Sequence, residues 1–200
     1  MLWKPLRRPL LLQFLVVAAV ILGVVGLVAG DPESLAAIVI AAILVALYPN
    51  RQALTEVRPV RWNIPLLAIA IVAALVALPY AIDMFQLQLD DTPGDEHAEF
   101  THWALSLVLL LNLLAAGVLA ATGRPGSRIL GILGGVAFIY LGVAALTSRD
   151  GGGIDPIGIW STFPALLSIL AGIGYIAATL MEERIAGFLP KFGGRPRPAT

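Results

Sequence analysis

The sequence contains no cysteine among its 200 residues. This absence excludes disulfide frameworks, thiolate metal sites and cysteine nucleophiles. Charge is scarce as well, because Asp, Glu, Lys and Arg make up 13% of the chain, about half the share found in soluble domains. Hydrophobic residues make up 58%. This composition predicts an integral membrane protein, whose first partner is the lipid bilayer.

Catalytic and nucleotide-binding motifs are also absent. The chain has no glycine-rich phosphate loop after a strand and no Gly-x-Ser motif, so neither nucleotide binding nor a serine hydrolase is indicated. No ionisable residue lies in the middle of an apolar stretch, where ion and proton transporters keep theirs. The sequence therefore favours a non-enzymatic protein with no nucleic-acid partner.

Six apolar stretches predict membrane-spanning helices, because a span needs about 20 mostly apolar residues. Turn-forming segments rich in Gly, Pro, Asp and Asn separate them. The predicted spans cover residues 10–29, 32–48, 64–82, 103–121, 129–147 and 157–181. We therefore predict an all-α fold, a polytopic six-helix bundle that forms one membrane domain over residues 1–186. Residues 187–200, rich in Pro, Gly and basic side chains, are predicted to form a disordered cytoplasmic tail.

Basic and acidic residues are sorted between alternate loops. If the N-terminus is inside, twelve of the 13 basic residues lie in cytoplasmic segments, and only Arg149 lies outside. Because cytoplasmic loops of membrane proteins carry an excess of Lys and Arg, we predict that both termini are cytoplasmic. Trp62 and Trp103 are then expected at the inner and outer membrane boundaries. Arginine outnumbers lysine 11 to 2, which is typical of a GC-rich prokaryotic genome and indicates a prokaryotic cell (inner) membrane.

The second predicted span is the weakest, since only the 13 residues from Leu35 to Leu47 are uninterrupted and apolar. A re-entrant segment is the alternative. If this segment did not cross, Arg51, Arg58 and Arg61 would lie outside and every later loop would be inverted. The charge pattern therefore predicts that it crosses.

Two pairs of similar segments suggest an internal duplication. Gly30–Ser34 resembles Gly123–Ser127, and Trp62–Leu67 resembles Trp160–Leu167, in the same order. Three helices per unit would make a 3+3 inverted repeat, the architecture of many transporters. The alternative interpretation is that both pairs are generic helix starts, with Pro in the first turn and Ser near the N-cap.

Two features of the predicted spans bear on helix packing. Asn112 lies near the centre of the fourth span, where its amide is expected either to bond a neighbouring helix or to contact a substrate. The pairs Gly26/Gly30 and Gly131/Gly135 have GxxxG spacing, which allows helices to approach closely. They indicate either a tightly packed bundle or self-association, and the sequence does not separate these.

The segment from Asp83 to His102 is acidic and contains both histidines. Residues 92–95 resemble a helix start, and a helix running from there into the fourth span would place Asp95, Glu99 and His102 on one face. Two carboxylates and an imidazole there would form a divalent metal site at the outer face. The alternative is a solvated acidic helix start. Ser106 lies four residues after His102, the spacing of a nucleophile and base on one helix.

Three function classes follow. The first is a non-catalytic accessory or scaffold subunit, forming a homo-oligomer or part of a larger membrane complex. The second is a small-solute carrier or channel built on the inverted repeat, with Asn112 contacting substrate. The third is an outer-face metal-binding or pH-sensing protein, since histidines near their usual pKa would gain charge as the outside acidifies. The sequence favours the first.

Overall fold

The computed structural model describes residues 9–56, 58–90, 101–147 and 162–188. All regular structure in these ranges is helical, which confirms the all-α prediction. The helices are α1 (Pro9–Val28), the 3₁₀ helix η2 (Pro32–Ser34), α2 (Leu35–Leu47), α3 (Arg51–Thr55), α4 (Ile64–Asp90), α6 (His102–Ala121), α7 (Ser127–Thr147) and α8 (Thr162–Phe188).

Five helices in the described ranges are long and apolar enough to cross a membrane: α1, α4, α6, α7 and α8. They contain 20 to 27 residues each, which matches the length that a bilayer requires. The chain is therefore a multi-pass integral membrane protein with about five spans. The second predicted span, residues 32–48, corresponds to the shorter apolar stretch Pro32–Leu47, made of η2 and α2.

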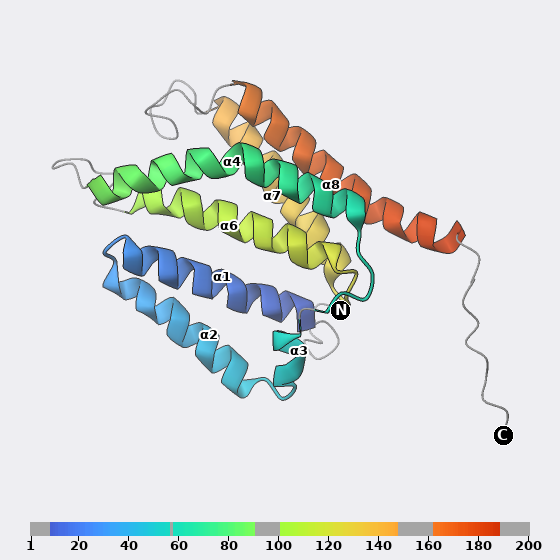
Figure 1. Ribbon diagram of the computed structural model, residues 1–200, viewed down its shortest axis with the longest axis horizontal. Helices are drawn as coiled ribbons and strands as arrows, with labels where there is room; N and C mark the ends of the chain where they lie inside the picture. Colours follow the sequence, from blue (N-terminus) through green and yellow to red (C-terminus); the bar gives the residue numbers. More distant parts are fainter. Residues whose placement is uncertain (1–8, 57, 91–100, 148–161, 189–200) are drawn as a thin grey trace.

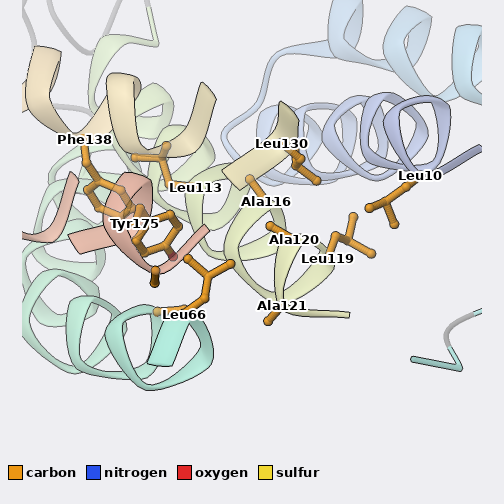
Figure 2. Packing of buried hydrophobic residues seen from close by; sticks show 12 residues of the cluster. Leu10, Leu66, Leu113, Ala116, Leu119, Ala120, Ala121, Leu130, Phe138 and Tyr175 are labelled. Carbon is orange, nitrogen blue, oxygen red and sulfur yellow. The ribbon is translucent and has the colours of Figure 1, made fainter. Parts of the chain in front are cut away.

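The helices form a four-helix unit with a hairpin attached to its side (Figure 1). In the unit, α6 packs against α4 and α7, and α8 packs against α7 and α4. The α1–α2 hairpin lies outside this unit, where α1 packs against α6. Figure 2 shows the centre of the unit, where Phe138 of α7 lies beside Tyr175 of α8, with ring centroids 5.2 Å apart. Leu66 of α4 and Leu113 of α6 belong to the same buried cluster.

Glycine spacing is explained by packing within the chain. A Cβ on Gly135 of α7 would lie 2.7 Å from the backbone oxygen of Gly172 on α8, and one on Gly131 would meet Thr179. A Cβ on Gly26 of α1 would likewise meet Ser34 at the start of α2. A Cβ on Gly30 would meet nothing within 4 Å, and the φ of 84° at this residue places it in the turn. Close approach of helices in one chain therefore accounts for these glycines without self-association.

Two helices continue beyond the residues predicted for their spans. α4 continues past residue 82 to Asp90, because its last turns pack on the start of α6: Met84 is buried against Trp103, and Gln88 Oε1 accepts a hydrogen bond of 3.4 Å from the Ala104 N–H. Trp103 is thus buried, whereas Trp62 is exposed as expected. α8 continues to Phe188, two residues into the predicted tail, and the rest of that tail lies outside the described residues.

The two halves pack differently. α7 lies along α8, whereas α2 and α4 make no comparable contact in the described part of the chain. An inverted repeat would pair α2 with α4 as it pairs α7 with α8. This difference weighs against the duplication, and it favours the interpretation of the similar segments as separate helix starts.

Candidate functional site

The predicted metal ligands are only partly described. α6 begins at His102, and Thr101 before it adopts the left-handed conformation, with φ 55°. A right-handed helix does not continue through such a residue, so the expected uninterrupted helix into the fourth span is wrong. Asp95 and Glu99 lie outside the described residues, within which no three His, Asp or Glu side chains are grouped for metal binding. The metal site stays a prediction.

His102 and Ser106 line the same cavity, in the half of the four-helix unit near the start of α6. This cavity has a volume of about 270 Å³, and Tyr80 also lines it. Apart from Ser168 of α8, its remaining walls are apolar, with Phe138 of α7 and Leu113 of α6 among them. His102 and Ser106, which the sequence places on one face of the helix, thus line one cavity. The other side chains that line this cavity suit an apolar ligand.

A second cavity, of about 370 Å³, lies between α4 and α8. It shares Ala77, Phe138 and Ser168 with the first cavity, so the two adjoin. The Ser168 hydroxyl donates a hydrogen bond of 2.8 Å to the Phe138 carbonyl, which satisfies the polar group of the shared wall. The volume falls in the range of small-molecule sites, and the lining suits hydrocarbon.

Two polar atoms inside the bundle have no hydrogen-bond partner in the described part of the chain: Asn112 Oδ1 and the Tyr175 hydroxyl. The predicted role of Asn112, in helix packing or in substrate contact, stays a prediction. Tyr175 is fully buried, and its hydroxyl lies against Gly117 of α6. Leaving such a group unpaired costs about 1–3 kcal/mol, so packing of the ring must compensate.

A buried polar cluster around Arg124 was not predicted. Arg124, in the turn between α6 and α7, is only 5% exposed. Its Nη1 donates to Gln13 Oε1 at 2.7 Å and to the Glu56 carbonyl, and its Nη2 donates to the Ala53 carbonyl at 2.9 Å. Gln13 Nε2 donates to the same Glu56 carbonyl. We call these four residues the arginine clasp; it joins α1, the end of α3 and the α6–α7 turn.

The clasp lies at the end of the molecule where the described arginines gather. Val60 and Asn63 donate backbone hydrogen bonds to Thr122 and Ala121 at the end of α6, which brings the start of α4 to the same end (Figure 1). The described arginines at this end are Arg51, Arg58, Arg61, Arg124 and Arg128. The opposite end carries Asp31, Glu33, Asp83 and Asp90, since the end of α1 and the end of α4 both meet the start of α6. The predicted sorting of charge along the sequence is thus a sorting in space.

A third cavity, of about 360 Å³, opens at the arginine end between the start of α4 and α8. Asn63 holds the two helices together there: its Nδ2 donates to the Ala178 carbonyl at 3.2 Å, and its Oδ1 accepts from the Leu66 N–H at 3.1 Å. The second bond is an N-cap, which fixes the first turn of α4. Arg61 and Trp62 line the cavity beside this cap.

Comparison of the chain with protein-family models, with curated proteins and with solved structures gives no match. The class of the protein, a multi-pass membrane protein, therefore rests on its apolar helices.

Proposed function

We propose that the protein is a non-catalytic accessory subunit of a prokaryotic cell membrane, and that α2 carries its contact with a partner protein. The position of α2 supports this most directly. α2 packs mainly on α1, and Ala41 is its one buried residue. Bulky apolar side chains such as Val39, Ile43 and Leu47 are exposed.

The length of α2 favours a protein neighbour over lipid. A three-residue 3₁₀ turn followed by a 13-residue helix spans about 25 Å, less than the ~30 Å of a bilayer's hydrocarbon core. A short span is accommodated by thinning the bilayer or by association with other helices. Because α1 covers one side only, a partner on the opposite side would relieve this mismatch.

The proposed subunit has six spans, with α2 as the second and both termini cytoplasmic. The segment Pro32–Leu47 begins at the acidic side, where Asp31 caps η2 by accepting a hydrogen bond of 3.0 Å from the Glu33 N–H. Its last turn is capped at the arginine side, where Arg51 Nη2 donates to the Ala46 carbonyl at 2.9 Å. A helix that joins the two oppositely charged ends supports a crossing segment rather than a re-entrant one.

Photo-crosslinking from α2 tests the proposed contact. Because the chain has no cysteine, Val39→Cys gives one attachment point for a benzophenone maleimide. Val143→Cys on α7, also exposed, is the matched control. We expect a discrete adduct from position 39 in native membranes and none from position 143, with the mass of the adduct separating a second copy from a different subunit. Equal, diffuse lipid adducts from both positions would mean that α2 faces lipid.

The adjoining cavities support a second candidate function, a carrier for an apolar solute. Ala77 lines both, so Ala77→Phe would obstruct both at once. Ala74→Phe on the same helix is the control, since it lines neither of them. Loss of lipophilic dye movement across proteoliposomes in the first variant alone would favour the carrier. Equal dye movement in both variants and in empty liposomes would rule out the carrier function.

A further inference from the structure

The cavity at the arginine end has one charged rim and an apolar floor. Arg61 and Trp62 form the rim, and both are exposed. The Arg61 backbone N–H bonds to Thr122, but its guanidinium makes no hydrogen bond with the described part of the chain. The floor consists of Ile64, Pro65, Ala178 and Met181. A cation with no hydrogen bond to the described residues, beside an apolar surface, suits an amphipathic anion.

The apolar cavity lined by Ala68 and Val72 lies farther along the same two helices, and we call the seam between α4 and α8 from Arg61 to Val72 the α4–α8 crevice. On α8, Met181, Ala178 and Gly174 follow one another at helical spacing on the side that meets α4. The helices are in contact between the two cavities, since a Cβ on Gly174 would lie 3.0 Å from the Ile69 side chain. Beyond this point α4 and α8 diverge (Figure 1), and the apolar cavity lined by Val72 opens between them.

The dimensions of the crevice match one leaflet. Half of a hydrocarbon core is about 15 Å, which corresponds to about ten residues of α-helix. A hydrocarbon chain whose head is held at Arg61 would therefore end near Val72, which lines the apolar cavity. Tryptophan at the level of the head is in the position that its amphipathic ring favours.

From this juxtaposition we propose that the α4–α8 crevice is a binding site for an anionic phospholipid. The Arg61 guanidinium holds the phosphate, Trp62 flanks the headgroup, and one acyl chain lies along the crevice past Ile69. Arginine suits this role because its planar fork of donors matches phosphate oxygens. Basic pockets between spanning helices are recognised sites for anionic headgroups. The site is separate from α2, so it stands or falls independently of the proposed subunit contact.

Native mass spectrometry of the full chain released from nanodiscs tests the site. The nanodiscs contain equal parts of palmitoyl-oleoyl phosphatidylglycerol and phosphatidylcholine. Arg61→Ala is compared with Arg58→Ala, an exposed arginine at the same end that does not line the cavity. We expect the wild type and Arg58→Ala to retain phosphatidylglycerol preferentially, and Arg61→Ala to lose about fivefold of that preference.

A second variant tests the acyl-chain part. Ala68→Phe fills the crevice near its apolar cavity and leaves Arg61 intact. We expect it to retain less of both lipids, and Arg61→Lys to keep part of the anionic preference. Equal effects of Arg61→Ala and Arg58→Ala would overturn the proposal, because the arginines would then act only as a diffuse surface charge. Displacement of the lipid by inorganic phosphate, with no effect of Ala68→Phe, would also overturn it.

Discussion

Arg124, in the turn between α6 and α7, donates a hydrogen bond of 2.7 Å to Gln13 near the start of α1. The two residues are 111 positions apart in the sequence, and the bond fastens the α1–α2 hairpin to the four-helix unit. The other acceptors of the guanidinium are backbone carbonyls at the end of α3. A cation suits that place, because carbonyls at a helix C-terminus have no partner within the helix.

Loss of this clasp is expected to destabilise the protein. Arg124→Ala removes charge-assisted bonds to three oxygens and should lower the free energy of unfolding by about 2–3 kcal/mol. Arg124→Lys keeps the charge but not the forked geometry, so an intermediate loss is expected. Thermal unfolding in detergent measures this, with exposed Arg58→Ala as the control. Equal stability of Arg124→Ala and Arg58→Ala would contradict the structural role of the clasp.

Variants of two neighbouring glycines, Gly134 and Gly135, distinguish packing within one chain from self-association of several chains. A Cβ on Gly135 would meet the Gly172 backbone at 2.7 Å, whereas one on Gly134 would have 3.5 Å to its nearest neighbour. Gly135→Ala should therefore lower the unfolding free energy by about 1–3 kcal/mol, and Gly134→Ala should be nearly neutral. The oligomeric state, measured by light scattering, should not change in either variant. Dissociation of an oligomer by Gly135→Ala would show that the glycine face joins separate chains.

A third prediction concerns the packing of the last turns of α4 against α6. Met84 is fully buried against Trp103, so Met84→Ala should cost about 2–5 kcal/mol by leaving a cavity. Leu89, on the same helix but half exposed, provides the control variant Leu89→Ala. Denaturant unfolding is followed by tryptophan fluorescence in a background where Trp3, Trp62 and Trp160 are replaced by Phe, so that Trp103 is the reporter. If the two variants unfold alike, the extension of α4 does not pack as described.

These turns also show where sequence reasoning succeeded and where it did not. The apolar runs predicted the first residues of α1, α4 and α6 to within one residue, because a membrane-spanning helix must consist mainly of apolar residues. α4 was ended too early because Asp83, Gln86 and Gln88 lower the hydropathy. The buried stripe of Ala81, Met84 and Gln88 continues at helical spacing and was the signal available.

The arginine clasp left no comparable pattern of residue types in the sequence. Its acceptors include backbone carbonyls 68 and 71 residues away from Arg124, and backbone oxygens leave no trace in residue type. Arg124 was therefore interpreted only as a charge that sets orientation. The exposed face of α2 could not be predicted either, because a uniformly apolar helix has no polar residues to distinguish its exposed face from its packed face.

The outer-face metal prediction has its own test. Metal content of detergent-purified protein is measured by plasma mass spectrometry, for the wild type and for Glu99→Ala combined with His102→Ala. The prediction requires a near-stoichiometric divalent ion in the wild type that the double variant lacks. The same low content in both proteins would leave Asp95, Glu99 and His102 as solvated groups before α6.

The central claim is that Pro32–Leu47 crosses the membrane as the second of six spans. Single-cysteine variants test it, because the chain has no other thiol. Glu33→Cys and Arg58→Cys stand at the two ends of this segment and are exposed to a membrane-impermeant maleimide in intact cells. We predict that Glu33→Cys is labelled from outside and that Arg58→Cys is labelled only after permeabilisation. Labelling of both positions from the same side would contradict the crossing and make the segment re-entrant.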